Sequence, residues 1–388
     1  MYLHGMKSNQ THLVGSLILL SSLCLFSCNL QERIVASAGI VQSIEATIDS
    51  IYEAHPTAQG IMVHVEAPGR SLSWSGASGY ADIGDTTPLD PTRPALIASN
   101  TKTYTAVAIL RLIEQDKMML SSSIGKLLSQ DTAELFSADG YDLEAVTVGH
   151  LLSHTSGIFD YVDADAFFAA VEAQPRHRWT AKEQLTLAVR AGDPLGPPGT
   201  VFSYADSNFL LLAEILSEQT DLPFYTAIRE LLSYEKNDLD DTWFETLEPH
   251  PKGTKALVHQ NSGSHGIGSY ELDVSFDLYG AGGIAATTKD LARFSQLLFE
   301  GRYFENPETL DLIYTKMPYG DGEDPRYLFG LMESEIQGLK AYGHGGFWGT
   351  VVQYLPDLNA SVSVFILERD ERKLRKDVLE AVVAHLKK

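Results

Sequence analysis

The stretch Ser99-Asn100-Thr101-Lys102 follows a polar, proline-containing loop and opens a predicted helix over residues 101–115. The apolar positions of that helix share one side: Ala106, Ile109, Leu110 and Ile113. Because positions i and i+3 lie on one helix face, the Lys102 amine can reach the Ser99 hydroxyl. The free N–H groups and the positive dipole end of a helix N-terminus also favour a developing anion. The stretch therefore predicts a nucleophilic serine with a lysine beside it, and the alternative is that Ser99 only caps the helix.

The Ser-x-x-Lys pattern occurs three times, at Ser99, Ser123 and Ser233, so the pattern alone does not choose among them. The copy at Ser123 has a glycine at its third position and starts no clear amphipathic run. The copy at Ser233 falls at a helix end and is followed by polar residues. Only Ser99 opens a long helix with an apolar face, which makes it the candidate nucleophile.

A tyrosine is the second candidate catalytic group. Tyr204-Ala205-Asp206 follows the turn Gly196-Pro197-Pro198-Gly199 and precedes an apolar helix over 209–215. A rigid turn that leads to a helix start can hold a tyrosine in a fixed position. A phenol with a pKa near 10 is a poor base at pH 7 unless an ammonium such as that of Lys102 stabilises the phenolate. Lys102 could instead be neutralised by burial, and a third reading is a packing tyrosine with a capping Asp206.

The third pattern is rich in glycine. Tyr342-Gly343-His344-Gly345-Gly346, with Gly349, describes a strand edge with little side-chain bulk, where a backbone can approach a ligand closely. A main-chain N–H here and that of Ser99 could form an oxyanion hole. His344 could hold a substrate carboxylate or join the proton network, and the alternative is a glycine-rich hairpin with an incidental histidine.

The order of predicted elements indicates one sheet built from both ends of the chain. A helix is predicted over 41–52, and strands are predicted over 60–66, 71–80, 327–332, 350–355 and 361–367. A helix over 288–298 and a final helix over 369–387 follow the same apolar spacing rules. Residues 118–275 are mostly helices and loops, and His154-Thr155-Ser156-Gly157 among them is interpreted as a polar turn that supports the site. We therefore expect an α/β lobe, about 38–117 and 276–388, and a helical lobe, about 118–275.

The N-terminal residues have the pattern of an export signal. Lys7 precedes a short apolar run over 13–26, which ends in Leu25-Phe26-Ser27-Cys28. The run is too short to span a membrane comfortably, and Cys28 stands where a bacterial lipoprotein signal places the cysteine that is lipidated. We expect a signal peptide over 1–28, a tether over 29–37 and a mature protein in the cell envelope or periplasm, anchored by lipid at Cys28. The alternative is ordinary cleavage with Cys28 incidental.

Composition narrows the classes of function. The 388 residues are 44% hydrophobic and carry a formal net charge of -22, which argues against a nucleic-acid partner. The sequence has no Gly-x-Ser-x-Gly, no His-Glu-x-x-His, no cysteine pair after residue 28 and no phosphate-binding Gly-x-x-x-x-Gly-Lys-Ser/Thr. We therefore expect no metal, nucleotide or flavin cofactor.

In this sequential order the motifs resemble those of the serine β-lactamase and penicillin-binding-protein superfamily, near the class C β-lactamase and D-alanyl-D-alanine carboxypeptidase branch. The resemblance covers roughly residues 40–385 and includes Gly282-Gly283-Ile284 and Thr287-Thr288-Lys289-Asp290-Leu291. It implies an α+β fold, an antiparallel sheet flanked by helices with an inserted all-helical lobe and the site between them. It also implies that Ser99 is acylated and that Lys102 and Tyr204 share acid and base duty. The N–H groups of Ser99 and Phe347 would hold the oxyanion, and His344 would replace the lysine of the usual Lys-Thr-Gly.

The chain departs from the pattern of this superfamily at two substrate-binding positions. The usual Tyr-x-Asn is Tyr204-Ala205-Asp206 here, and an ionised aspartate can accept but not donate a hydrogen bond. Asp206 could instead pair with Lys102 and keep it charged. Gly345 stands where a threonine is common, beside Gly346, which removes a hydroxyl near any substrate carboxylate.

We expect an exported serine hydrolase that cleaves an amide or ester through an acyl-Ser99 intermediate. Candidate substrates are D-amino-acid peptides of the cell wall, including peptidoglycan, other small peptides or esters, and β-lactams. The alternatives are a carboxylesterase of the same fold and, from another class, a non-catalytic penicillin-binding or sensor protein.

Overall fold

The computed structural model describes residue 1 and residues 38–388 except 83, 85, 265 and 321–325. The expected signal peptide, the tether and Cys28 lie outside the described residues. No helix in the described part of the chain is long and apolar enough to cross a bilayer.

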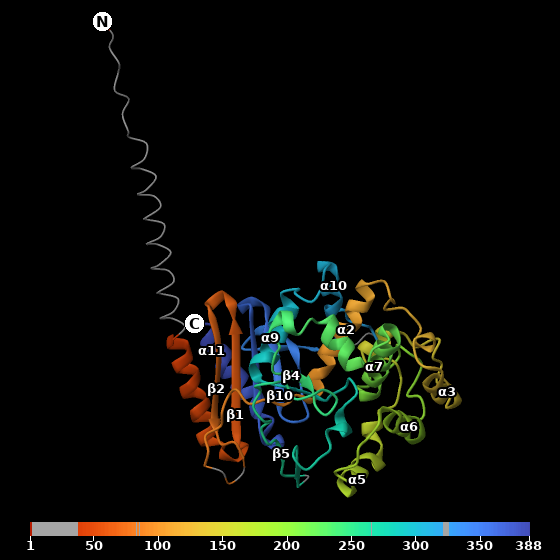
Figure 1. The fold of residues 1–388 in the computed structure, drawn as a ribbon, viewed down its shortest axis with the longest axis horizontal. Coiled ribbons are helices and arrows are strands. Elements are labelled where there is room, and N and C mark those ends of the chain that lie inside the picture. Colours follow the sequence, from red (N-terminus) through yellow and green to blue (C-terminus); the bar gives the residue numbers. More distant parts are fainter. Residues whose placement is uncertain (2–37, 83, 85, 265, 321–325) are drawn as a thin grey trace.

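The main sheet has six antiparallel strands in the order β2-β1-β11-β10-β9-β8. Its strands are β1 (Gly60–Ala67), β2 (Leu72–Gly79), β8 (Met332–Ile336), β9 (Leu339–Gly345), β10 (Thr350–Leu355) and β11 (Ala360–Ile366). Strand β1, near the beginning of the chain, pairs with β11, near its end, with Val63 opposite Val364. This pairing confirms that the two ends of the chain build one sheet, with the long middle segment inserted between them (Figure 1).

Side chains alternate between two cores on the two faces of the sheet. On β1, Ile61, Val63 and Val65 join one core, whereas Met62 joins the other. Helix α11 (Leu374–Leu386) and the helical residues 38–54 pack with the first core, through Val378, Val382, Ile44 and Ile48. Helix α9 (Thr288–Phe299) covers the opposite face, against β1, β10 and β11. This alternation is the period of two that a strand buried on both faces requires.

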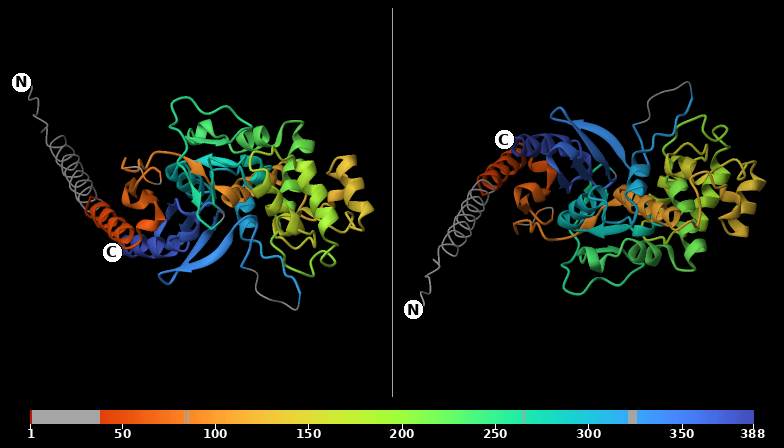
Figure 2. Two further views of the ribbon diagram at one scale, coloured as in Figure 1. Left: turned by 90° about the horizontal axis from the view of Figure 1, so that it is seen from below. Right: turned by 90° about the horizontal axis from the view of Figure 1, so that it is seen from above.

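The inserted segment carries six helices: α3 (Gln130–Ala138), α4 (Val148–Leu152), α5 (Asp165–Ala173), α6 (Ala181–Ala191), α7 (Asp206–Thr220) and α8 (Phe224–Leu231). These helices lie at the opposite end of the molecule from the helical residues 38–54 and α11, as both views of Figure 2 show. Helix α2 (Thr101–Glu114) packs against α7 and α8 and so connects the helical end to the sheet. The short helix α10 (Pro307–Asp311) follows α9.

The structure corrects the sequence analysis in two places. A strand was predicted over 327–332, but strand β8 begins only at Met332. The apolar residues before Met332 pack against α2, where Thr103 Oγ1 donates to the Gly330 carbonyl over 2.7 Å. The segment 118–275 is also not purely helical. It contains the short strands β4 (Thr242–Phe244), β5 (Asn261–Ser262) and β6 (Ile267–Gly268), and β4 joins β3 (Ala95–Leu96) and β7 (Ile284–Ala286) in a second sheet.

Candidate active site

Ser99 lies in a short 3-10 turn, Ala98–Asn100, that leads directly into α2. Ala98 has a φ of 47°, a left-handed conformation that is costly for alanine and that concentrates at functional sites. The turn is held from the sheet, because Asn100 Nδ2 donates to the Thr350 hydroxyl over 2.9 Å and that hydroxyl donates to the Ile97 carbonyl over 3.0 Å. Ser99 itself is partly exposed, so a substrate can reach its hydroxyl.

Lys102 is fully buried one turn further along α2, and three polar groups hold its ammonium. Nζ lies 3.1 Å from Ser99 Oγ, 3.0 Å from the Ala281 carbonyl and 2.6 Å from Asp206 Oδ1. The sequence analysis placed Lys102 beside Ser99 and left open its pairing with Asp206, and the structure shows both contacts. A buried ammonium with a carboxylate partner and further hydrogen bonds is the arrangement in which a charged lysine is tolerated in an interior.

Tyr204 approaches the same hydroxyl from the segment just before α7, close enough for Ser99 to act on the pKa of the phenol. Its ring centroid lies 5.0 Å from Lys102 Nζ, within the range of a cation–π contact. Burial, followed by the nearby Asp206 charge, raises the pKa of Tyr204 well above 10. The phenol is therefore protonated at neutral pH, which suits a proton donor better than a base.

Asp206 is the first residue of α7 and has little exposed surface. The charge of Asp206 acts on two more buried carboxyl groups, those of Asp160 and Asp277. Burial and then the charge of Asp206 raise the pKa of Asp160 to about 7 and that of Asp277 to about 7. The sequence analysis missed both residues, since neither belongs to a motif and only the tertiary fold brings them to Lys102.

His344 lies on β9 and is buried. Its Nδ1 is 2.7 Å from the Gly345 carbonyl and its Nε2 is 3.3 Å from the Tyr327 hydroxyl. Burial, with the charge of Lys102 second, lowers the pKa of His344 to about 3. A neutral ring that donates from Nδ1 and accepts at Nε2 has no N–H left for a substrate carboxylate. Of the roles considered in the sequence analysis, the arrangement therefore favours His344 as a member of the proton network over His344 as the group that holds a substrate carboxylate.

The glycines after His344 bring the end of β9 against the Ser99 turn. A Cβ on Gly346 would collide with the Ile97 carbonyl and the Thr350 hydroxyl, so only glycine fits there. Within the described residues, neither the Ser99 N–H nor the Phe347 N–H donates a hydrogen bond. Two unbonded amides are what an oxyanion hole requires.

Arg375, from α11, contacts the same turn from the other side. Its Nη1 donates to the Gly346 carbonyl over 3.1 Å and to the Thr350 carbonyl over 2.6 Å. In a planar trans peptide the carbonyl and the following N–H point in opposite directions. The Phe347 N–H therefore points away from Arg375.

The sequence analysis interpreted His154 only as part of a supporting turn, but the structure brings it into direct contact with the tyrosine segment. The His154 and Tyr204 rings lie 4.4 Å apart. His154 Nδ1 accepts from the Ala205 N–H over 3.1 Å and from Asn208 Nδ2 at the same distance. Asn208 lies in the first turn of α7, four residues after Tyr204, and the sequence analysis did not single it out.

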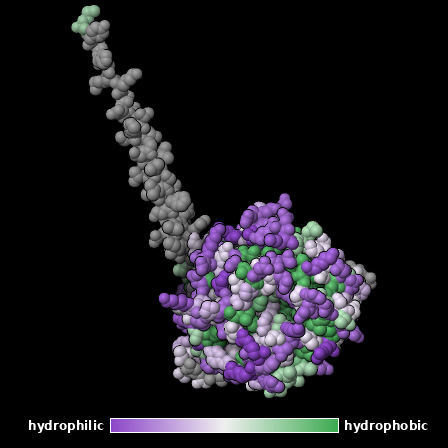
Figure 3. Space-filling view, turned by 45° about the vertical axis from the view of Figure 1, so that its right-hand side comes forward, coloured by the Kyte–Doolittle hydropathy of each residue, from purple (hydrophilic) through white to green (hydrophobic). Residues whose placement is uncertain are grey.

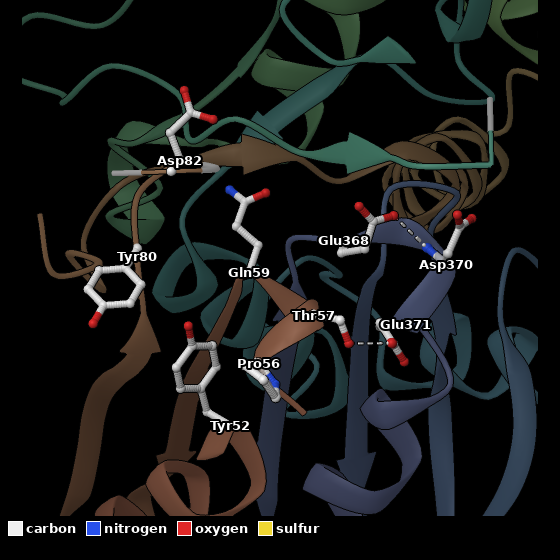
Figure 4. A pocket seen from close by; sticks show the side chains of 10 residues that line it. Tyr52, Pro56, Thr57, Gln59, Tyr80, Asp82, Glu368, Asp370 and Glu371 are labelled. Carbon is white, nitrogen blue, oxygen red and sulfur yellow. Dashed lines mark hydrogen bonds between the residues drawn. The ribbon is translucent and has the colours of Figure 1, made fainter. Parts of the chain in front are cut away.

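The other two Ser-x-x-Lys copies are structural. The Ser123 hydroxyl accepts from the Gly125 N–H and donates to the Leu143 carbonyl, and the Ser233 hydroxyl donates to the Glu230 carbonyl. A pocket of about 460 Å³ lies at the edge of the sheet near Tyr52, Tyr80 and Glu371, and none of the site residues lines it (Figure 4). The candidate site therefore remains at Ser99.

Several solved structures share this fold, among them an amidase and an amidohydrolase. The D-amino acid amidase from Ochrobactrum anthropi SV3 superposes with a TM-score of 0.74 at 19% identity, covering 90% of this chain and 99% of that one. A D-stereospecific amidohydrolase from a Streptomyces species gives a TM-score of 0.71 at 23% identity, covering 86% and 98%. These similarities confirm the predicted fold class, an antiparallel sheet flanked by helices.

The sequence profile described as Beta-lactamase matches residues 48–385. The chain therefore belongs to the Beta-lactamase family. A D-aminopeptidase of Cereibacter sphaeroides is 27% identical over 281 residues, which cover 70% of this chain and 49% of the relative. The chain thus spans about half the length of that relative.

Proposed function

We propose that this protein hydrolyses small amides and peptides through an acyl-Ser99 intermediate, with D-amino-acid amides and short D-amino-acid peptides as its substrates. The observation that carries the proposal is the Ser99 hydroxyl, which is hydrogen-bonded to Lys102 and lies beside the Tyr204 phenol. The similarity to a D-aminopeptidase and to D-amino acid amidases supports this substrate class.

The contacts around Ser99 suggest how the proton moves. Because Tyr204 is kept protonated, the role of base falls to Lys102. The proton of Lys102 can pass to the nearby Asp160 or Asp277, each with a pKa of about 7, while Asp206 stays ionised. Ser99 Oγ then attacks the carbonyl carbon, and the developing oxyanion is bound by the N–H groups of Ser99 and Phe347. Tyr204 donates its proton to the leaving nitrogen, the C–N bond breaks, and an ester on Ser99 remains. Water then releases the acid by the reverse proton path.

Asp206 bears on the choice among the substrates that the sequence analysis considered. Where the related enzymes usually have asparagine, this chain has a carboxylate bound to Lys102. An acceptor cannot donate to the acylated amide carbonyl of a penicillin or of a cell-wall peptide. This favours amidase or aminopeptidase activity over D-alanyl-D-alanine carboxypeptidase or β-lactamase activity.

Intact-mass spectrometry tests the proposal. The purified protein is exposed to a fluorophosphonate, to an activated ester and to a penicillin, with Ser99→Ala as the control. We expect a fluorophosphonate adduct on wild type only, and a transient ester adduct that decays by turnover. An ester adduct with no amidase activity would indicate the carboxylesterase alternative, and a penicillin adduct that never decays would indicate a sensor protein. No adduct from any reagent would overturn the proposal.

We also propose that the protein is exported and anchored by lipid at Cys28, where it would meet peptidoglycan fragments. The support is the apolar run over 13–26 that ends at Cys28. Expression of the full chain in a bacterial host with labelled palmitate tests this, with Cys28→Ala as the control. We expect label in the membrane fraction for wild type and none for the variant; an unlabelled wild-type chain would contradict the anchor.

A further inference from the structure

Three carboxyl groups surround the single ammonium of Lys102. Asp206 touches Nζ directly, and the charge of Lys102 also acts on Asp160 and Asp277. One cation cannot neutralise three ionised carboxylates, and Asp160 and Asp277, with pKa values of about 7, are only partly ionised at neutral pH. A buried excess charge is costly unless a counter-charge arrives.

Of these three carboxyl groups, Asp277 has a buried oxygen that makes neither a hydrogen bond nor an ion pair among the described residues. It is 9% exposed, and its Oδ1 makes no hydrogen bond with any described residue. The oxygen lies against Gly282, where a Cβ would collide with it. Gly282 follows Ala281, whose carbonyl binds Lys102, so the unpaired carboxyl group faces the same small region as the ammonium. Such a group calls for an explanation, because nearly all buried polar atoms have partners.

We propose that Asp206, supported by Asp160 and Asp277, binds the free ammonium group of the substrate; this inference rests on the proposed function. Asp206 occupies the position where related enzymes have an asparagine that can donate to a substrate carbonyl. A carboxylate accepts only, so the ligand it selects must donate, and an ammonium carries three donors. Replacing asparagine by aspartate thus changes the preferred substrate from an N-acylated one to one with an unblocked amine.

The geometry is compatible with the reaction. The Lys102 ammonium contacts both the Asp206 carboxylate and the Ser99 hydroxyl, over 2.6 Å and 3.1 Å, so the carboxylate and the hydroxyl are close together. In an α-amino amide a single carbon atom separates the ammonium from the carbonyl that Ser99 attacks. A substrate bound through its carbonyl at Ser99 therefore places its ammonium beside Asp206. The substrate class is amides, esters and short peptides whose first residue has a free α-ammonium.

The test compares D-alanine p-nitroanilide with its N-acetyl derivative. In wild type we expect kcat/KM to favour the unblocked anilide by about 100-fold, since a site built for a polar group rejects an analogue that lacks it. Asp277→Asn and Asp160→Asn, which leave the Lys102–Asp206 pair intact, should each reduce this preference about tenfold, mainly through KM. Asp206→Asn should abolish or reverse it. Glu218→Gln, on the exposed side of α7, removes the same charge elsewhere and should leave the ratio unchanged.

A second readout does not depend on turnover. D-alanine amide and N-acetyl-D-alanine amide are compared as protectants of Ser99 against the fluorophosphonate. We expect protection by the unblocked amide at concentrations about 100-fold lower. Equal protection by both amides, none by the unblocked one, or an unchanged preference in Asp277→Asn and Asp206→Asn would overturn the ammonium site while Ser99 labelling upholds the proposed function. Absence of labelling would instead overturn the proposed function itself.

Discussion

Lys102 shows how one buried side chain links stability and chemistry. Its ammonium and the Asp206 carboxylate are removed from water together. Replacing Lys102 with methionine keeps the aliphatic volume but leaves Asp206 without its counter-charge. We expect Lys102→Met to lower the rate of Ser99 acylation by about 10²–10⁴-fold, the usual contribution of a general base. We also expect a loss of about 3–5 kcal/mol in the free energy of unfolding, measured with urea.

A double variant separates these two effects. Lys102→Met with Asp206→Asn removes both charges, so the stability should recover most of its loss because no uncompensated charge remains. Acylation should stay slow, since the base is still absent. Equal stability of the single and double variants would contradict the buried ion pair.

The raised pKa of Asp277 predicts that the free energy of unfolding depends on pH. Its pKa is about 7 in the folded protein, against a reference value of 3.8. Between these values the folded state binds more protons than the unfolded state, so the free energy of unfolding falls as the pH rises from 4 to 7. Asp277→Asn removes this penalty. We expect the variant to be more stable than wild type by about 1–3 kcal/mol at pH 8, with a smaller difference at pH 5. Urea unfolding at the two pH values measures it, and a gain at pH 5 that equals or exceeds the gain at pH 8 would contradict the raised pKa.

At the scale of residues, sequence predicted the local part of the site. Ser99 and Lys102 are three positions apart on one helix, so their contact follows from helix geometry alone. Asp160 and Asp277 could not be found this way, because each reaches Lys102 only through the packing of separate segments. Gly282 was quoted only as part of the family resemblance, and the steric reason for a glycine there, the Asp277 carboxyl, is seen only in the structure.

At the scale of elements, prediction succeeded where the regular spacing of apolar residues continued over several residues. Strand β10 has the predicted bounds, and α2 and α9 differ from prediction by one residue at one end. The strand predicted over 327–332 was wrong because an apolar run buried against a helix resembles a buried strand. Strands β4, β5 and β6 have two or three residues each, which is too few for any period to show.

Helix α11 also has a role that its amphipathic pattern does not suggest. Arg375 fixes the Gly346 carbonyl and so directs the Phe347 N–H away from itself. Burial and then the charge of Arg372 lower the pKa of Arg375 to about 10, so it is still charged at pH 7. We expect Arg375→Met to lower kcat by about 10–100-fold with little change in KM, because oxyanion binding acts mainly in the transition state.

The matched control is Arg372→Met, in the segment just before α11. Among the described residues the Arg372 side chain donates to the Arg369 carbonyl and to neither the Gly346 nor the Thr350 carbonyl. It should leave kcat near the wild-type value, while Arg375→Lys, which can still donate to a carbonyl, should recover part of the loss. A rise in KM alone for Arg375→Met would indicate a role in substrate binding rather than in positioning the amide.

At the scale of the whole molecule, the first and the last of the described helices are neighbours. The helical residues 38–54 lie beside α11, and Thr47 Oγ1 is 2.9 Å from His385 Nε2 (Figure 2). Both helices cover the same face of a sheet whose central strands come from opposite ends of the sequence. The face drawn in Figure 3 is largely hydrophilic, with smaller apolar areas between. The layer between these two helices and the sheet is one of the two hydrophobic cores.

The active site therefore depends on residues that never approach it. Ile44 and Ile48 are fully buried under the sheet, and burial of each contributes about 1.5–3 kcal/mol. That sum is a large share of the roughly 5–15 kcal/mol by which a domain is stable. We expect a protein of residues 38–388 to fold and acylate Ser99, and one of residues 56–388 to lose its cooperative thermal transition and its fluorophosphonate labelling. Adding a peptide of residues 38–55 should restore part of both, since the two ends meet by packing rather than by covalent connection. Full labelling of the 56–388 protein without the peptide would show that the helical lobe and the sheet hold the site without this layer.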